Sequence, residues 1–453
     1  MENIKAREKW FYGMGSLGKD LIQGMFMTYL MVFYTDVFGI GAAAAGILLM
    51  VARIWDALLN PIIGITIDRT RTKWGKSRPY VLLMPFPFLV FAVLTFTVPD
   101  LGVTAKLVYA YVTYILAGTF FTFYDVALWS MLPSITTNLK ERSTMIALAR
   151  IFTMVGILVV STLALPMINS LGGGSTSRGY TLLVLILAVI SIIFSTSAFF
   201  NTKEKVTETA KPPKFKEQVR VLANNKPLQI VICGVIINSF NMGINNAVGI
   251  YHLTYYLKAA SLIPVYMLLT TVASMIGMAL AGTFVKKIGN RKTTIFTLAL
   301  SVIPTALMFF IPAQNITLMF ILMALSSLIG GIPAVSTTGM IAETVDYTEL
   351  KTGIRADGLI FSFNSFSIQF GMALASGAAG VILQFAGYVP NDMNQGPTAL
   401  LWINLLRTII PAIVCAVSLI IIRLYPINKK DHEEITINLK ARQVENNTNA
   451  VNL

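Results

Sequence analysis

The chain has 453 residues, of which 55% are hydrophobic and only 12% are charged. Soluble domains carry roughly twice that share of charged residues, so the composition excludes an ordinary soluble protein of two or three domains. The formal net charge of +14 does not indicate nucleic-acid binding, because the basic residues lie in alternate short loops, as the positive-inside rule requires. We therefore expect a polytopic membrane protein whose environment is the lipid bilayer, with no nucleic-acid partner.

Apolar runs of about twenty residues, the length that crosses the hydrocarbon core of a bilayer, recur along the whole chain. In chain order they predict twelve transmembrane helices, at 12–35, 41–67, 79–98, 104–133, 146–168, 179–200, 228–257, 261–285, 293–312, 316–342, 356–388 and 398–425. The breaks fall at loop signals such as "NSLGGGSTSRG" and "KKIGNRK".

The longest connection separates six predicted spans from six others. This predicts an N-terminal six-helix bundle at 1–200, a cytoplasmic central loop at 201–227, a C-terminal six-helix bundle at 228–425 and a cytoplasmic tail at 426–453. Most of the 35 Lys and Arg residues then lie on one side of the membrane. We expect a multi-pass protein of the cytoplasmic (inner) membrane with both termini in the cytoplasm.

A weak sequence similarity between two loops supports a fold built from two structural repeats. "GITIDRTRTKWGKSR" and "GTFVKKIGNRK" each place a charged pair four residues after a glycine, following the second and the eighth predicted span. Such loops fit the major facilitator superfamily, although ordinary basic-loop topology is the alternative. The predicted fold class is an all-α membrane protein with the major facilitator fold, twelve transmembrane helices in two six-helix halves.

Ionisable residues inside the predicted spans gather in the N-terminal half, where such residues usually face a cavity or a partner. In "FTFYDVALWS", Asp125 and Trp129 lie four residues apart and therefore share a helix face. A carboxylate can accept sugar hydroxyls, and a flat indole can cover the apolar face of a pyranose. The alternative is a structural Asp125–Arg150 pair with Trp129 packed in the bundle.

Two further groups complete this set on other predicted helices. Arg150 offers a planar fork of donors, either for hydroxyls or for the carboxylates of Asp20 and Asp125. Lys19 and Asp20 are adjacent and diverge by about 100° on a helix, so we expect only one of them to point straight at a ligand. Lys19 is otherwise a local counter-charge.

Polar but uncharged residues mark the C-terminal half. Asn241, Ser365 and Gln369 are candidates for a cavity wall, although interhelical hydrogen bonding explains them equally well. Soluble-enzyme motifs are absent, and neither His252 nor His432 has a partner at ligand spacing. We therefore expect no enzymatic activity, no metal and no cofactor other than a coupling proton or monovalent cation, and no obligate protein partner.

Several long motifs in order resemble the glycoside–pentoside–hexuronide:cation symporter family, most closely its melibiose carriers. They are "YGMGSLGKD", "VARIWDALLNPIIG", "DRTRTKWGKSRPY", "ERSTMIALARIF" and "ETVDYTELKTGIRADG", and the resemblance covers nearly the whole chain. It implies two halves that rock around a central sugar site. The positions that hold the sugar in melibiose carriers correspond here to Lys19, Asp20, Asp125, Trp129 and Arg150.

This resemblance, together with charge, predicts the substrate class. Two carboxylates that face the sugar disfavour a uronic acid by like-charge repulsion, so we expect a neutral, galactoside-like glycoside. Two rivals from other classes remain open. One is a lysolipid transporter, since distant relatives handle lipids, and the other is a non-transporting sugar sensor.

The family's cation site is where this sequence departs from the pattern. The resemblance implies a coupling-ion site at Asp56, Asn60 and Thr122, but Asn60 replaces the second carboxylate and Gln369 replaces a lysine. A lone buried carboxylate can carry a proton, and Arg53 would oppose that if the two pair. We expect proton-coupled or uncoupled transport first, and sodium-coupled symport second.

Overall fold

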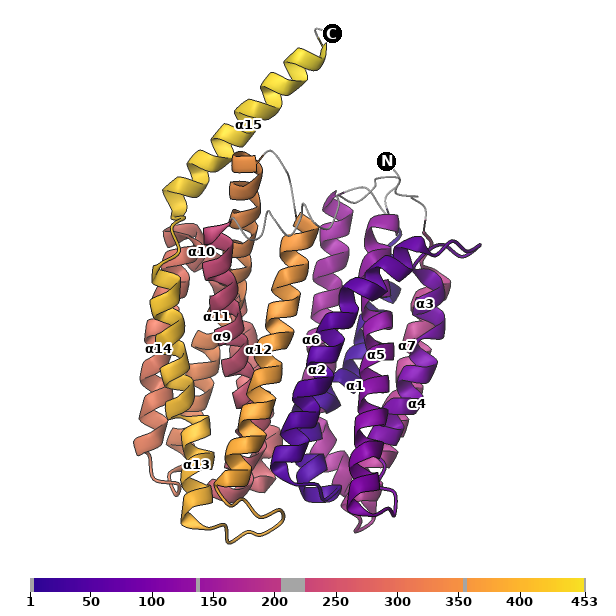
Figure 1. The fold of residues 1–453 in the computed structure, drawn as a ribbon, viewed down its shortest axis with the longest axis vertical. Helices are drawn as coiled ribbons and strands as arrows, with labels where there is room; N and C mark the ends of the chain where they lie inside the picture. The colour runs from indigo at the N-terminus through magenta and orange to yellow at the C-terminus, as the bar shows by residue number, and fades with distance from the viewer. Residues whose placement is uncertain (1–3, 136–138, 205–224, 353–356, 452–453) are drawn as a thin grey trace. The chain divides into compact units, whose positions relative to one another are not determined.

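A computed structural model describes residues 4–135, 139–204, 225–352 and 357–451, and these contain helices but no β-strand. Most of the predicted central loop therefore lies outside the described residues. The first part of the chain forms α1 (Ala6–Val32), η1 (Phe33–Val37), α2 (Ala42–Arg69), α3 (Arg78–Leu83), α4 (Pro85–Thr95), α5 (Val103–Ile135), α6 (Leu139–Gly172) and α7 (Thr176–Asn201). The second part forms α9 (Lys226–Tyr251), η2 (His252–Tyr256), η3 (Ala260–Leu262), α10 (Ile263–Leu307), η4 (Met308–Phe310), α11 (Ile316–Thr352), α12 (Asp357–Phe385), α13 (Pro397–Arg407), α14 (Ile409–Arg423) and α15 (Lys429–Val451). Figure 1 labels the α-helices along the ribbon.

Ten segments of the described residues are long and apolar enough to cross a membrane, against twelve predicted. Two physical details account for the difference. α1 has 27 residues but contains the charged pair Lys19 and Asp20 in its middle. α10 joins two predicted spans through Gly289, whose φ of 80° and ψ of 166° interrupt the helix. Counting α1 and the two parts of α10 separately gives the predicted twelve, and the all-helical fold class is confirmed.

Two of the predicted spans are broken helices. The third span consists of α3 and α4, which meet at Met84 before a proline at the start of α4. The twelfth consists of α13 and α14, which are separated at Thr408, with φ of −123° and ψ of −77°. Such breaks are tolerated within a membrane where neighbouring groups satisfy the freed backbone atoms, and the Thr408 hydroxyl donates to the Asn404 carbonyl oxygen at 2.6 Å.

The chain forms two compact units. Unit 1 draws on Met1–Ala210, Asn246–Leu268 and Ala373–Ile403, and unit 2 on Lys211–Asn245, Leu269–Met372 and Asn404–Leu453. Four of the five boundaries between the units fall inside α9, α10, α12 and α13. The division of the chain into halves at 201–227 stays a prediction.

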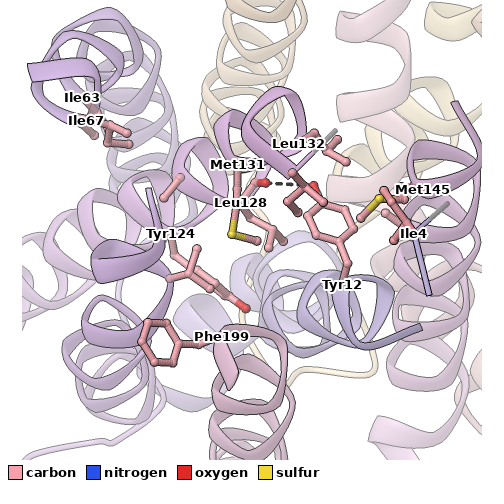
Figure 2. Close-up of a cluster of buried hydrophobic side chains, with 14 residues drawn as sticks. Ile4, Tyr12, Ile63, Ile67, Tyr124, Leu128, Met131, Leu132, Met145 and Phe199 are labelled. Atoms are coloured by element: carbon pink, nitrogen blue, oxygen red, sulfur yellow. Dashed lines mark hydrogen bonds between the residues drawn. The ribbon is translucent and has the colours of Figure 1, made fainter. Parts of the chain in front are cut away.

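The core of unit 1 is tied together by buried tyrosine hydroxyls. Figure 2 shows Tyr12 of α1 beside Leu128 of α5, where its hydroxyl donates to the Leu128 carbonyl oxygen at 2.9 Å. The Tyr124 hydroxyl lies 2.9 Å from the Gly15 carbonyl oxygen and 2.7 Å from Ser195 Oγ. Each tyrosine is fully buried and so joins apolar packing to a polar contact between helices.

Small residues let α1 and α6 approach each other closely. A Cβ added at Gly24 would lie 3.3 Å from Val160, and one added at Gly156 would lie 2.9 Å from Leu17. Helix association within a membrane depends on such close packing, because lipid tails are as apolar as the side chains. The contact between these helices places Lys19 and Asp20 next to α6.

Unit 2 has its own core, which includes the start of the C-terminal tail. Tyr425, Ile427 and Ile435 are buried with apolar side chains of α9, α10 and α11. The Tyr425 hydroxyl donates to Glu343 at 3.0 Å, and His432 lies 3.1 Å from Asp346. The first turns of α15 therefore pack on α11.

Candidate functional site

The five predicted sugar-site residues all lie in unit 1 and are linked by contacts. They come from three helices: Lys19 and Asp20 from α1, Asp125 and Trp129 from α5, and Arg150 from α6. No two of these helices are consecutive except α5 and α6, so the cluster depends on tertiary packing.

Lys19 is the centre of the cluster. Its Nζ atom lies 2.8 Å and 2.9 Å from the two carboxylate oxygens of Asp20 and 3.0 Å from Oδ1 of Asp125. The Lys19 side chain is 5% exposed. One ammonium group therefore bridges two carboxylates from different helices, which is the condition under which buried charge is tolerated.

The two carboxylates have different environments. The side chain of Asp20 is 6% exposed, whereas that of Asp125 is 31% exposed. Oδ1 of Asp125 also accepts a hydrogen bond from Trp129 Nε1 at 3.0 Å. Among the described residues, the contacts of Asp125 go to Oδ1, which leaves Oδ2 for a ligand hydroxyl.

One face of the Trp129 indole ring is covered by Arg150. The guanidinium carbon of Arg150 lies 4.8 Å from the centre of the indole ring, at cation–π distance. Arg150 is exposed, and Trp129 is half-buried. The sequence predicted that Trp129 and Asp125 share a face, and the hydrogen bond between them agrees with that prediction. The sequence did not indicate that Arg150 covers one side of the ring.

The predicted coupling-ion residues form a second group, on α2 and α5. Asp56 is half-buried, its Oδ1 atom is buried, and that atom accepts no hydrogen bond from any residue that the structure describes. Arg53, one turn earlier on α2, is buried and interacts electrostatically with Asp56. A negative group with an unused oxygen thus lies near a positive one.

The other two members of this group, Asn60 and Thr122, donate hydrogen bonds to backbone carbonyl oxygens. Asn60 Nδ2 donates to the Asp56 carbonyl oxygen at 2.8 Å, and the Thr122 hydroxyl donates to the Gly118 carbonyl oxygen at 2.9 Å. Gly118 faces the Asp56 carboxylate directly, since an added Cβ would lie 2.7 Å from Oδ1 and 2.9 Å from Oδ2. The glycine is therefore required for the carboxylate to fit against α5.

The candidate wall residues of the C-terminal half differ among themselves. Asn241 Nδ2 donates to Cys415 Sγ at 3.1 Å, and Asn245 Nδ2 lies 3.0 Å from Asn241 Oδ1. Ser365 is exposed and donates to the carbonyl oxygen of its own helix at Phe361, 3.1 Å away. Gln369 is half-buried. Asn241 thus makes an interhelical hydrogen bond, which was the alternative to its interpretation as a cavity-wall residue.

Sequence reasoning missed four polar contacts. Arg407 of α13 donates to Asn245 Oδ1 within unit 2. Thr153 donates to Asp20 Oδ2 at 2.5 Å. Asp36 accepts the hydroxyls of two tyrosines at the end of α1. Thr153 follows Arg150 by three residues, and this helical spacing is the signal that could have identified it.

Metal ligation has no support in the described part of the chain. No group of three or more His, Cys, Asp or Glu side chains there could hold a metal ion. The bonding groups of the site are carboxylate, ammonium, guanidinium, indole and hydroxyl, which are suited to hydrogen bonding and to ring contact.

The helices and the charged cluster within them define a class of protein: a multi-pass membrane transporter with the major facilitator fold. The solved structures agree. The crystal structure of a point mutant of the nucleoside transporter NupG has a TM-score of 0.70 at 13% identity, covering 92% of this chain and 99% of that one. A bacterial homologue of the human lysosomal transporter Spinster has a TM-score of 0.68 at 11% identity, covering 92% and 95%. At these identities the likeness shows the fold alone.

The family follows from sequence comparison. Residues 11–429 match the model of the MFS/sugar transport protein family, and the chain belongs to that family. The isoprimeverose transporter of Lactiplantibacillus pentosus is 36% identical over 431 residues, covering 93% of this chain and 89% of the relative. The putative glycoside/cation symporter YagG of Escherichia coli is 29% identical, covering 96% and 95%. The glucuronide carrier protein homologue of the same species is 27% identical, covering 95% of each chain. The predicted family is confirmed, and this family contains transporters rather than enzymes.

Proposed function

We propose that this protein moves a neutral, galactoside-like glycoside across the cytoplasmic membrane by alternating access. Asp125, Trp129 and Arg150 contact the sugar, and Lys19 and Asp20 support them from beneath. The observation on which the proposal depends is the position of Lys19, with its ammonium at 2.8–3.0 Å from two carboxylates.

The charges of the cluster support a neutral substrate. Lys19 and Arg150 together balance Asp20 and Asp125, so the site has no formal excess of charge for an ionised sugar to neutralise. A carboxylate on the ligand would approach the exposed Asp125 and be repelled by it. The names of the relatives support a glycoside, since one is an isoprimeverose transporter and another a putative glycoside/cation symporter.

The environment of Asp56 supports proton-coupled or uncoupled transport. Only one carboxylate is present, with Arg53 already interacting with it, and Asn60 supplies no second negative charge. Sodium favours hard oxygen ligands and charge neutralisation, which a single carboxylate close to an arginine provides poorly.

Sodium coupling is the second candidate, and a specific observation favours it. The buried Oδ1 atom of Asp56 accepts no hydrogen bond within the described residues, so it is available as a ligand. Asn60 donates through Nδ2, and its own carbonyl oxygen can serve as a second ligand. Thr122 would supply the third oxygen.

A role in lysolipid transport or in sugar sensing is less well supported, because the family match is to sugar transport proteins over residues 11–429. We further propose that both termini face the cytoplasm, as the Lys and Arg distribution indicates. Protease digestion of a C-terminal tag in sealed right-side-out vesicles tests the orientation.

The decisive experiment combines binding and transport by the purified full chain. Melibiose, isoprimeverose and a phenyl glucuronide are titrated calorimetrically, with and without sodium, and then offered to proteoliposomes with an imposed proton or sodium gradient. We expect a neutral disaccharide to bind and the glucuronide not to bind, with no accumulation driven by sodium. Uptake of the glucuronide alone would overturn the substrate class, and sodium-driven accumulation would establish the second candidate.

A further inference from the structure

The carboxylate of Asp20 is fully engaged before any sugar arrives. Both of its oxygens contact the Lys19 ammonium, at 2.8 Å and 2.9 Å, and Oδ2 also accepts the Thr153 hydroxyl at 2.5 Å. Because the side chain is only 6% exposed, little of it remains for a ligand. Asp20 therefore differs from Asp125, whose second oxygen has no such partners in the described residues.

Thr153 reaches Asp20 because of its position on α6. It lies three residues after Arg150, so the two side chains project from one face of the helix. The helix is held close to α1 one turn further on, where Gly156 meets Leu17. The two side chains therefore contact different parts of the same cluster. Arg150 lies at its exposed side, and Thr153 lies at its buried side.

We propose that Thr153 is a positioning residue of the sugar site, a proposal that rests on the proposed function. Its hydroxyl holds Asp20 beneath Lys19, so that the ammonium stays between the two carboxylates and Oδ2 of Asp125 remains open to a sugar hydroxyl. Without this bond Asp20 can rotate, and the ammonium then moves away from Asp125.

The test compares two substitutions at one position. Thr153→Val keeps the shape and removes the hydroxyl, whereas Thr153→Ser keeps the hydroxyl. Melibiose and isoprimeverose are titrated into each purified variant. A hydrogen bond to a charged group is strong enough that its loss should weaken Kd by about tenfold or more in the valine variant. The serine variant should stay within about threefold of the wild type.

A matched control comes from the same helix. The Thr162 hydroxyl makes no hydrogen bond within the described residues, so Thr162→Val should leave Kd and Tm unchanged. If Thr153→Val binds like the wild type, or if Thr153→Ser is as weak as Thr153→Val, the positioning role is overturned. If the wild type itself binds neither sugar, it is the proposed function that fails.

A double-mutant cycle separates positioning from a general structural effect. If Thr153 acts only through Asp20, Thr153→Val should cause no further loss of affinity in an Asp20→Asn background. In transport, the substitution should raise KM and leave kcat unchanged, because it alters the binding geometry and not the conformational cycle. Additive losses of affinity in the cycle would contradict the proposal.

A separate feature lies in unit 1 where α1 ends. η1 and η2 are two short π-helical turns that follow α1 and α9, the first helices of the two predicted halves. The two turns can be aligned residue by residue. The backbone N–H groups of Phe38 and Leu257 each donate a hydrogen bond to the carbonyl oxygen five residues earlier, and the next residues, Gly39 and Lys258, each adopt positive φ. Asp36 and Tyr255 occupy equivalent positions in the two turns.

These equivalent residues contact each other. The Tyr255 hydroxyl donates to Asp36 Oδ2 at 2.5 Å, and the Tyr388 hydroxyl, which follows α12, donates to Oδ1 at 2.5 Å. Thr35 bonds to Tyr251 at 2.7 Å beside them. One carboxylate thus joins three segments that are far apart in the chain.

We infer that Asp36, Tyr255 and Tyr388 form a latch that holds this end of unit 1 shut and must open in each transport cycle. The inference rests on the alternating-access part of the proposed function. α2 and α12 also meet closely at this end, since an added Cβ at Gly46 would lie 2.8 Å from Gly380. A shut end held by a few hydrogen bonds can open without the unfolding of a helix.

Spin-label distance measurements test the latch. Labels at the exposed positions Thr104 and Val389 report the opening of this end. The double variant Tyr255→Phe with Tyr388→Phe removes two hydrogen bonds to a charged group. It should therefore raise the ratio of long-distance to short-distance species by about tenfold or more. Tyr111→Phe is the control, because no hydrogen bond of its hydroxyl occurs among the described residues.

The two ways of failing are distinguishable. If the distance distribution of the double variant equals that of the wild type, while melibiose or isoprimeverose shifts the wild type, the latch is overturned. If neither sugar ever changes the wild-type distribution, alternating access at this end is overturned.

Discussion

The Lys19–Asp20–Asp125 cluster and the Asp56 side chain both place carboxylates inside membrane-spanning helices, but their charges are compensated differently. In the cluster, one ammonium lies within 3.0 Å of both acids. At Asp56, Arg53 interacts electrostatically, but the buried Oδ1 atom accepts no hydrogen bond within the described residues. An unsatisfied buried carboxylate oxygen is costly, and it persists where function uses it.

This difference indicates two kinds of ligand. A cluster whose charges already cancel is suited to an uncharged molecule that brings hydroxyls, since binding then requires no further compensation. A carboxylate with an unused oxygen is suited to a proton or a cation, which brings the missing positive charge. In the proposed function, sugar and coupling ion therefore bind to different sets of helices: α1, α5 and α6 for the sugar, and α2 and α5 for the ion.

The largest expected effect comes from removing the shared cation. Lys19→Met leaves Asp20 and Asp125 without their bridging ammonium, and breaking a buried pair in this way costs about 3–5 kcal/mol. We expect sugar binding to be lost and Tm to fall, measured by calorimetric titration and thermal unfolding in detergent. Lys226→Met, at the exposed start of α9, is the control and should change neither. A Lys19→Met protein with normal Kd would show that the cluster is not the sugar site.

Next in size is the loss of coupling when Asp56 is neutralised. Asp56→Asn removes the carboxylate that we propose carries the proton or the cation, and this carboxylate lies outside the charged cluster. We expect melibiose or isoprimeverose to bind with an affinity within about threefold of the wild type, since no direct hydrogen bond to the sugar is lost. Uptake into proteoliposomes should reach equilibrium but no longer respond to an imposed gradient. Gradient-driven accumulation in the variant would show that the coupling ion binds elsewhere.

Much of this comparison was predictable from the sequence. Ionisable residues inside apolar runs identified Lys19, Asp20, Asp125 and Arg150 as a group, and the family resemblance identified Asn60 as the departure beside Asp56. The contact between Lys19 and Asp125 was not predictable, because adjacent residues on a helix diverge and only the long, flexible lysine stem can bridge that angle. Sequence spacing describes a helix face, whereas a side chain with four rotatable bonds can reach across two faces.

Other details required tertiary packing. Trp129 was expected to offer its face to a pyranose, but Arg150 from the next helix lies over the ring. The sequence also did not indicate that Gly118 makes room for the Asp56 carboxylate, because a glycine in an apolar helix has many possible explanations. Only the position of the Asp56 carboxylate on the neighbouring helix shows why a side chain is excluded there.

A smaller effect is expected from filling that space. In Gly118→Ala the new Cβ would lie 2.7 Å from Asp56 Oδ1, so the carboxylate must move, at a cost of about 1–3 kcal/mol. We expect the response to an imposed ion gradient to fall while the Kd for the sugar is retained. Gly64→Ala on α2 is the matched control, because its added Cβ meets nothing within 4 Å. It should be neutral or stabilise by up to about 1 kcal/mol. Equal effects of the two substitutions would remove Gly118 from the ion site.

The smallest expected effect sharpens the comparison at Asn60. Asn60→Asp replaces the Nδ2 donor, which bonds to the Asp56 carbonyl oxygen at 2.8 Å, by an acceptor. The loss of that bond costs about 0.5–1.5 kcal/mol, and the second carboxylate repels Asp56 unless a cation binds between them. We therefore expect a modest fall in Tm that millimolar sodium reverses, with an unchanged sugar Kd in the absence of sodium. The measurement is the Tm of thermal unfolding in sodium and in choline buffers. The control substitution is Asn246→Asp, at a half-buried position of α9. A variant as insensitive to sodium as the wild type would mean that Gln369, the other departure from the family pattern, also prevents sodium binding.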